Sequence, residues 1–393
     1  MGDKYSKNVL RLGFVSFFTD MSTEMILGIL PLFIIGQLGA SRALLGLIEG
    51  VGEFVSYVSR TISGPLSDKL GRRKIFIVLG YSISTLSKPL FAVSSVWTHA
   101  LFVRGTDRFG KGVRTAPRDA LLSDSVDSSR VGRAFGTHRT LDQSGAVIGP
   151  LLAFALIPLM GIRGIFWVSF IPGAIAVLIL IFLVKERKMS KREGTSLLSN
   201  FSTVFRGRLM ILLIILSIFS IGAFNFSFIL LQGMELELAP AFIPLVFLVI
   251  NLAHAAVGYP SGILSDKIGA ERTLILAYSV FFVTSFMGLI SPDQPYWAFA
   301  MAAVFGVYIG MTDTVQRAVI PKYVPNELRG TAYGIFYLMI GISFLLANAI
   351  FGTLWDILGS STAFTYSLST TAIALVALTL FTRLPEKKVV SLK

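Results

Sequence analysis

The chain has 393 residues, of which 54% are hydrophobic and 15% are charged, and it has a formal net charge of +13 and no cysteine. With a mean hydropathy of +0.74, it is too apolar for a soluble protein of this length, so we expect an integral membrane protein. The absence of cysteine excludes disulfides and thiolate metal sites.

Mostly apolar segments recur along the whole chain and predict an all-α membrane fold. Each is about 20 residues or longer, enough for a helix to cross a hydrocarbon core of roughly 30 Å. We place twelve such spans at residues 9–36, 43–67, 73–95, 97–123, 131–160, 163–184, 209–233, 241–265, 272–291, 296–320, 328–358 and 361–382.

The basic residues are distributed unevenly about these spans. Most lysines and arginines lie in or beside the amino terminus, the loops that follow even-numbered spans and the carboxyl tail, whereas only Arg42 and Arg163 lie at the opposite loops. This bias predicts a multi-pass protein of the cytoplasmic membrane with both termini in the cytoplasm. The positive charge then reflects topology and contact with anionic lipid rather than a nucleic-acid partner.

Acidic residues occur within the first two spans and the fifth. Asp20 and Glu24 lie four residues apart, as do Glu49 and Glu53, so each pair occupies one helix face; Asp142 lies in span five. Ionisable groups at membrane depth face a bundle interior or a water-filled cavity, which makes these acids candidate proton-coupling groups.

The fourth span is the most charged. Seven ionisable side chains fall within an arc of roughly 140° of an α-helix, and apolar side chains occupy the rest. We expect the charged face to line a cavity and to pair with the acids of spans one, two and five in a balanced network. Depth along the spans pairs Glu49 with Arg104, Glu24 with Arg108, and Asp20 or Asp142 with Lys111 or Arg114. The seven residues are Arg104, Asp107, Arg108, Lys111, Arg114, Arg118 and Asp119.

An internal duplication divides the chain. The segment GPLSDKLGRR at Gly64–Arg73 is echoed 198 residues later by GILSDKIGAER at Gly262–Arg272. The same offset aligns other segments without a gap, so we predict a six-helix bundle at 1–184, a cytoplasmic linker at 185–208 and a second six-helix bundle at 209–393.

The loop between spans two and three resembles a signature of the major facilitator superfamily, in its twelve-span, proton-coupled antiporter branch for drug or metabolite efflux. The resemblance rests on Gly64, Asp68, Gly71, Arg72 and Arg73. It implies two six-helix halves around a central site that opens alternately to the two membrane faces. It also implies that Asp68, Arg72 and Asp124 form a charge relay that latches one state, and that Gly64 allows close approach to the opposite half.

Span five resembles the antiporter motif of the same superfamily through Gly136, Gly145, Gly149 and Pro150. The resemblance implies export of substrate in exchange for protons. The alternative is a seam of small residues that packs two helices closely. The superfamily places span one beside the central cavity, and Glu24 is the first candidate for the proton carrier because Arg108 should lie level with it. The alternative is a permanently ionised structural pair.

The second half is poor in charge, and its polar candidates for the substrate cavity are few. We expect an adaptable apolar wall there, formed by aromatic residues that otherwise belong to the core or face lipid: Phe224, Phe226, Phe228, Tyr308, Tyr333 and Tyr337. The polar candidates are Asn225, Asn251, His254, Asp313 and Arg317.

Several other functions find no support in the motifs. Gly105–Gly112 approaches a phosphate-binding loop, but Gly112 stands where a hydroxyl is required. No catalytic arrangement, metal site or cofactor site is expected, and the chain is not predicted to be an enzyme. The leading interpretation is a monomeric, proton-coupled exporter of small organic compounds. The alternatives are a proton-coupled importer or facilitator of an anionic metabolite, and a non-transporting receptor or scaffold.

Overall fold

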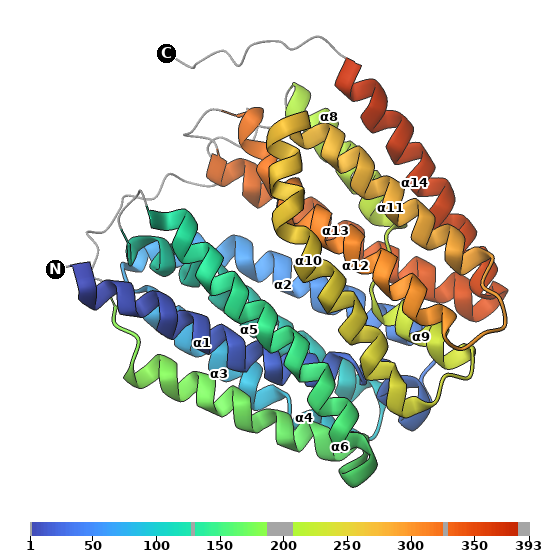
Figure 1. Ribbon diagram of the computed structural model, residues 1–393, viewed down its shortest axis with the longest axis horizontal. Helices are drawn as coiled ribbons and strands as arrows, with labels where there is room; N and C mark the ends of the chain where they lie inside the picture. The colour runs from blue at the N-terminus through green and yellow to red at the C-terminus, as the bar shows by residue number, and fades with distance from the viewer. Residues whose placement is uncertain (1, 127–129, 187–206, 325–328, 384–393) are drawn as a thin grey trace. The chain divides into compact units, whose positions relative to one another are not determined.

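A computed structural model describes residues 2–126, 130–186, 207–324 and 329–383. Within these ranges all regular secondary structure is helical (Figure 1). The all-α fold expected from the sequence is therefore confirmed.

The helices of the first half follow the predicted spans. The last of them, α6, has non-helical backbone at Gly161 (φ 66°, ψ 178°), a left-handed conformation that glycine adopts without steric cost. Gly161 thus separates two helical segments, the predicted fifth and sixth spans. The elements are α1 (Gly2–Leu27), η1 (Leu32–Gln37), α2 (Arg42–Leu70), α3 (Arg73–Ser87), α4 (Leu90–Val93), α5 (Trp97–Asp124) and α6 (Val131–Phe182).

In the second half, predicted span seven is broken between α8 and α9. The Asn225 side chain accepts a hydrogen bond from the backbone N–H of Ser227 (2.9 Å), and the Asn225 N–H donates to Oδ1 of Asn348 (3.0 Å). These bonds satisfy backbone groups that a break in a membrane helix leaves without helical partners. The elements are α8 (Arg208–Gly222), α9 (Ser227–Glu235), η3 (Pro240–Phe242), α10 (Ile243–Ile268), α11 (Ala270–Leu289), α12 (Trp297–Ala318), η4 (Ile320–Lys322), α13 (Arg329–Leu358) and α14 (Ser360–Arg383).

Eight helical segments of the described chain are long and apolar enough to cross a membrane, with α6 counted once. Helices α1, α2 and α5 are also long enough, but they contain the ionisable residues noted in the sequence. Counted with the two segments of α6, these helices account for the twelve predicted spans.

The chain divides into two compact units. The first contains Met1–Ala40, Val51–Gly194 and Leu238–Leu248; the second contains Ser41–Gly50, Thr195–Glu237 and Val249–Lys393. The first turns of α2 therefore group with the second unit, and the start of α10 groups with the first.

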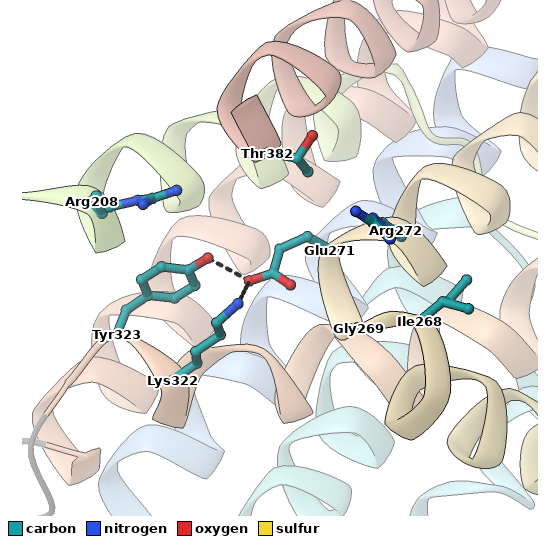
Figure 2. Close-up of a pocket in the computed structure, with 8 residues that line it drawn as sticks. All are labelled: Arg208, Ile268, Gly269, Glu271, Arg272, Lys322, Tyr323 and Thr382. Carbon is teal, nitrogen blue, oxygen red and sulfur yellow. Dashed lines mark hydrogen bonds and ion pairs between the residues drawn. The ribbon is translucent and has the colours of Figure 1, made fainter. Parts of the chain in front are cut away.

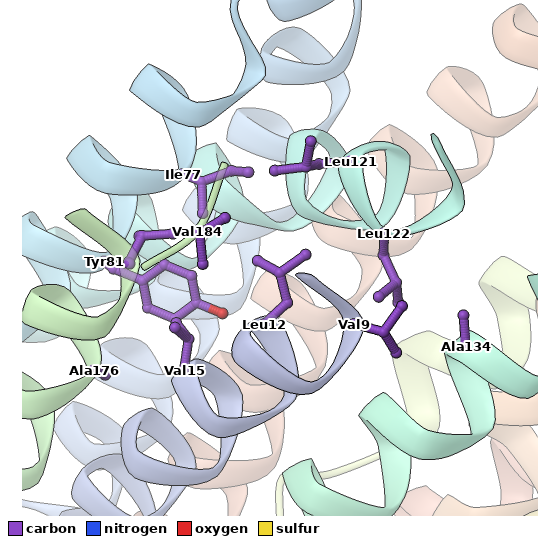
Figure 3. Close-up of a cluster of buried hydrophobic side chains, with 11 residues drawn as sticks. Val9, Leu12, Val15, Ile77, Tyr81, Leu121, Leu122, Ala134, Ala176 and Val184 are labelled. Carbon is purple, nitrogen blue, oxygen red and sulfur yellow. The ribbon is translucent and has the colours of Figure 1, made fainter. Parts of the chain in front are cut away.

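The first unit has an apolar core where α1, α3, α5 and α6 meet (Figure 3). Burial of such side chains against one another fixes the helices that carry the charged groups described below. The core contains Val9, Leu12, Val15, Ile77, Tyr81, Leu121, Leu122, Ala134, Ala176, Leu180 and Val184.

The second unit has an aromatic core instead. The Phe219 and Tyr278 rings stack with centroids 3.5 Å apart, and Phe224 packs near Phe305 at 5.6 Å. Three residues expected as a substrate wall belong to this core: Phe224 is 2% exposed, Phe228 0% and Tyr308 5%. For these three, interior packing replaces the expected role, whereas Phe226, Tyr333 and Tyr337 are only half-buried.

The two halves repeat a close helix contact as well as a sequence. A Cβ on Gly112 of α5 would lie 2.5 Å from the carbonyl oxygen of Ser56 in α2. A Cβ on Gly310 of α12 would lie 2.8 Å from the carbonyl oxygen of His254 in α10. Both residue pairs are related by the offset of 198 found in the sequence. The duplication therefore extends to the packing of corresponding helices.

Candidate functional site

The charged face of α5 is buried in the first unit. Arg104 is 1% exposed, Asp107 5% and Arg108 3%, whereas Phe102 on the opposite side is 72% exposed. This burial agrees with the two-sided helix expected from the sequence. Charged groups buried to this extent require partners, because removing them from water is costly.

Several of those partners come from neighbouring helices. Arg108 forms an ion pair with Glu53 of α2 (Nη2 to Oε1, 3.2 Å), which depth along the spans did not predict. Asp107 lies 3.7 Å from Nη1 of Arg104 and accepts a 2.5 Å hydrogen bond from the Ser84 hydroxyl. The network therefore joins α5 to α2 and α3.

Arg114 is held differently, although it is also buried at 4% exposure. Its guanidinium lies 4.2 Å from the centre of the Tyr81 ring, a cation–π contact. The Nε and Nη1 atoms make no hydrogen bond within the described residues. Arg114 is thus a buried cation whose donors are available to an anion.

A carboxyl pair joins α1 to α6. The carboxyl groups of Asp20 and Asp142 lie within range of a side-chain hydrogen bond. Two ionised carboxylates this close repel each other, so the arrangement favours a proton shared between the two acids. Cations surround the pair: Nη1 of Arg139 lies 3.1 Å from Oδ2 of Asp142, and Lys111 interacts electrostatically with Asp20.

The motif of span five brings α6 against α1 at this pair. A Cβ on Gly145 would lie 2.2 Å from the Phe17 carbonyl oxygen, and one on Gly149 would lie 2.8 Å from the Glu24 Cβ. A Cβ on Gly136 would meet nothing within 4 Å. Gly145 and Gly149 are therefore close-packing positions just beyond Asp142, Pro150 follows inside the helix, and Gly136 has no such packing role.

Two buried polar groups near this pair were not assigned to the site from the sequence. Lys88, 1% exposed, donates to the hydroxyls of Ser22 (2.9 Å) and Thr23 (2.8 Å) on α1. The Nε2 atom of His138 lies 2.9 Å from the Ser16 hydroxyl. The sequence signal for Lys88 was a lysine within an apolar span. The contact of His138 could not be predicted, because its partner Ser16 resembles the other small polar residues of membrane helices.

The loop after α2 contains an ion pair, but with a different arginine from the one expected. Arg73, rather than Arg72, bonds both Asp68 (3.0 Å) and Asp124. Gly71 ends α2 with a positive φ of 64°, and Arg72 extends into solvent before α3 begins at Arg73. A Cβ on Gly64 would lie 3.3 Å from the Ala116 Cβ, so this glycine packs against α5.

The second copy of the loop has the same ion pair with the charges exchanged. Glu271 accepts a hydrogen bond from Lys322 (2.9 Å) and another from the Tyr323 hydroxyl. With the offset of 198, Glu271 corresponds to Arg73 and Lys322 to Asp124. The alignment of the two copies showed that Glu271 stands where the first copy has Arg73. It did not show that the partner changes from the acid Asp124 to the base Lys322.

The polar candidates of the second half are less closely grouped. Nε2 of His254 lies 3.6 Å from Oδ2 of Asp313, whose side chain is 52% exposed. Arg317 donates to the Asp313 backbone oxygen (3.0 Å), and Asn251 is buried. Also in the second unit, Glu49 of α2 accepts a hydrogen bond from the Ser227 hydroxyl (3.2 Å). Within the described ranges no three His, Cys, Asp or Glu side chains are grouped so as to hold a metal ion.

Comparison with known families gives one match over nearly the whole chain. The family model described as Major Facilitator Superfamily matches residues 12–250 and 212–393. An uncharacterised MFS-type transporter of Methanocaldococcus jannaschii is 34% identical over 362 residues, covering 90% of this chain and 89% of that protein. The multidrug resistance protein MdtG of Proteus mirabilis is 26% identical, covering 82% of this chain and 83% of that protein.

Solved transporters share the fold at low sequence identity. A bacterial homologue of the human lysosomal transporter Spinster, crystallised in an inward-facing and occupied conformation, has a TM-score of 0.77 at 15% identity. It covers 98% of both chains. A peptide transporter crystallised with sulfate has a TM-score of 0.78 at 14% identity, covering 96% of this chain and 94% of that chain. At these identities the likeness supports the fold alone.

Proposed function

The chain belongs to the major facilitator superfamily of membrane transporters, and on this basis we propose that it exports small organic compounds in exchange for protons. The name of the relative MdtG, a multidrug resistance protein, supports export. We further propose a cytoplasmic-membrane location with both termini in the cytoplasm, and two six-helix bundles joined by the linker at 185–208.

The observation that carries proton coupling is the close approach of the Asp20 and Asp142 carboxyl groups. Two carboxyl groups that share one proton can release it when their separation changes or a cation approaches. Asp20 and Asp142 are on different helices, α1 and α6, and Lys111 of α5 interacts with Asp20. A movement of α5 relative to α1 is therefore coupled to protonation of the pair, which makes this pair a stronger candidate for the proton carrier than Glu24.

The burial of cations on α5 favours a second candidate, the transport of an anionic metabolite. Arg114 has two donor atoms without hydrogen bonds in the described chain, and arginine binds carboxylates and phosphates in fixed geometry. The two candidates differ in their substrates: the exporter binds neutral or cationic organic compounds, and the importer requires an anion. A screen of both classes against the purified protein by thermal shift separates them, because ligands of the folded state raise its apparent stability.

Asp142→Asn tests the proton carrier. Compounds found in the screen are loaded into proteoliposomes, and their flux is measured with and without an imposed pH gradient. We expect the variant to retain exchange of substrate for substrate but to lose acceleration by the gradient, since asparagine mimics a permanently protonated acid. Asp20→Asn should behave in the same way.

The matched control is Asp293→Asn, which removes an exposed carboxylate between α11 and α12. It should respond to the gradient like the unmodified protein. Gradient-driven flux that persists unchanged in both Asp142→Asn and Asp20→Asn would remove the pair from the mechanism, and Glu24→Gln would then be tested in the same assay.

A further inference from the structure

A polar cavity lies at one end of the second half, on the side where its loops are basic. Its volume is about 310 Å³, and α8 and α11 begin at its wall while α14 ends there (Figure 2). It is separate from the buried charges of α5, which belong to the first unit. The lining residues are Arg208, Ile268, Gly269, Glu271, Arg272, Lys322, Tyr323 and Thr382.

The lining of this cavity has an excess of positive charge. Three basic side chains and one acid line it, so the lining residues together have a net charge of +2. The single acid, Glu271, is already bonded to Lys322 and Tyr323. Figure 2 shows the Arg208 side chain extending into the cavity from one side, with Arg272 on the other side. Two cations that line one cavity are stabilised by an anion between them.

The equivalent region of the first half shows why Arg272 is available. There, Lys74 corresponds to Arg272 and donates to the carbonyl oxygens of Ile181 (2.8 Å) and Val184 (2.7 Å) at the end of α6. In the second half, Arg208 takes over this kind of contact by donating to the Phe381 carbonyl near the end of α14 (3.3 Å). Arg272 is exposed and forms no hydrogen bond or ion pair with the described residues.

The size and polarity of the cavity favour a phosphate group. Arginine binds phosphate oxygens through paired N–H donors, and the helix N-termini of α8 and α11 favour negative charge. The Thr382 hydroxyl is a further hydrogen-bonding group at the wall. A volume of about ten water molecules leaves room for a phosphate with part of an attached organic group.

We propose that this cavity binds a phosphate-bearing anion, either a soluble phosphate or the headgroup of an anionic phospholipid. Basic pockets between membrane helices on the cytoplasmic side bind lipid headgroups, and the cavity lies on the side predicted to be cytoplasmic. The anion would bridge α8, α11 and α14 and thereby stabilise that end of the second half. This site is distinct from the proposed proton carrier and does not depend on it.

Thermal unfolding of the full chain tests the site in two arms. In detergent, the unfolding temperature is measured against inorganic phosphate, with sodium chloride at equal ionic strength as reference because salt alone screens repulsion between the cations. In nanodiscs, phosphatidylcholine alone is compared with phosphatidylcholine that contains phosphatidylglycerol. A shift with phosphate above the chloride reference indicates a soluble ligand, and a shift only with phosphatidylglycerol indicates a lipid headgroup.

Arg272→Gln decides whether either shift comes from this cavity. The variant removes one charge from a side chain that no described residue holds, so we expect it to fold. Its half-maximal shift should require roughly tenfold more ligand, as expected for the loss of one charged contact. The matched control is Arg383→Gln, an exposed arginine at the end of α14 that does not line the cavity; it should match the unmodified protein.

Glu271→Gln gives an effect of opposite sign. It removes the only acid of the lining, so the anion should bind more tightly. The proposal is overturned if neither arm produces a shift beyond its reference, or if Arg272→Gln and Arg383→Gln respond alike. Failure here leaves the exchange of substrate for protons untouched, since that is measured by flux in proteoliposomes.

Discussion

Helices α5 and α12 occupy the same place in the two repeats, but the buried side chains compared below are charged in α5 and apolar in α12. With the offset of 198, Arg104 and Asp107 of α5 correspond to Ala302 and Phe305 of α12. Ala302 is 0% exposed and Phe305 2%, so all four positions are buried. The glycine contact to the neighbouring helix is nevertheless present in both, at Gly112 and Gly310. Helix packing has therefore been retained while the chemistry of the interior has diverged.

The comparison teaches that buried charge on α5 is not a requirement of the fold. The same backbone contact is compatible with an aromatic interior, which avoids the cost of removing ions from water. Charge retained in only one half is therefore better explained by function than by stability. This argument supports our placement of proton coupling in the first half.

The largest expected effect comes from placing an α5 acid in α12. Phe305→Asp puts a carboxylate against the aromatic rings of Phe224, Phe281 and Tyr308. We expect a loss of several kcal/mol in the free energy of unfolding, because an unpaired charge and a cavity are introduced together. The measurement is thermal or denaturant unfolding of the purified protein in detergent.

Phe305→Leu is the matched control for that change. It keeps the site apolar and should cost about 1–2 kcal/mol. If Phe305→Asp unfolds no more readily than Phe305→Leu, the interior of the second half tolerates charge, and the contrast with α5 loses its physical basis.

The sequence predicted the helices because apolar runs of this length must be helical to cross a membrane, and it predicted the buried face of α5 because the charged side chains recur with helical periodicity. The break at Ala223–Phe226 was less predictable, since the surrounding run is apolar and only Asn225 marks it. The partners of the charged residues on α5 could not be predicted from the sequence either. Depth along a span does not determine which neighbouring helix a side chain contacts, so the ion pair of Arg108 with Glu53 was missed.

The loop after α2 shows a second limit of prediction from sequence. Adjacent arginines, Arg72 and Arg73, are equivalent in composition, and the left-handed conformation of Gly71 decides which of them turns inward. Family resemblance indicated an interaction of Asp68 and Asp124 with Arg72, and the structure shows Arg73 in that position instead.

The next largest effect is expected at the close glycine contact that α5 makes with α2 and that α12 makes with α10. Gly112→Ala and Gly310→Ala each place a methyl group against a carbonyl oxygen, at 2.5 Å and 2.8 Å. We expect each to cost about 1–3 kcal/mol, because the helices must separate. Thermal unfolding in detergent measures the loss.

Gly105→Ala is the control on α5, since a Cβ there would meet nothing within 4 Å. It should be neutral or slightly stabilising, because alanine favours the helix over glycine by about 1 kcal/mol. A Gly112→Ala variant as stable as Gly105→Ala would show that α2 and α5 do not need their close contact.

The smallest effect is expected at the ion pair beside the loop after α2. This pair is Arg73 with Asp124 in the first half, and the equivalent pair in the second half, Glu271 with Lys322, has the opposite order of charges. Arg73→Glu alone would place three acids together, and Asp124→Lys alone would place a lysine beside Arg73. Each should cost about 1 kcal/mol or more, as expected for partly exposed charged contacts. The double variant reproduces the order of charges in the second half and should recover part of the loss, as a double-mutant cycle measures.

Recovery should be partial because Asp68 bonds Arg73 in the first half (3.0 Å), and this bond is lost when Arg73 is replaced by an acid. Adding Asp68→Asn to the double variant removes the remaining repulsion between two acids and should recover more of the stability. If the losses of the single variants simply add, the sign of each charge is fixed by surroundings beyond the pair. Recovery by the double variant would instead establish that the loop requires a pair of opposite charges in either order.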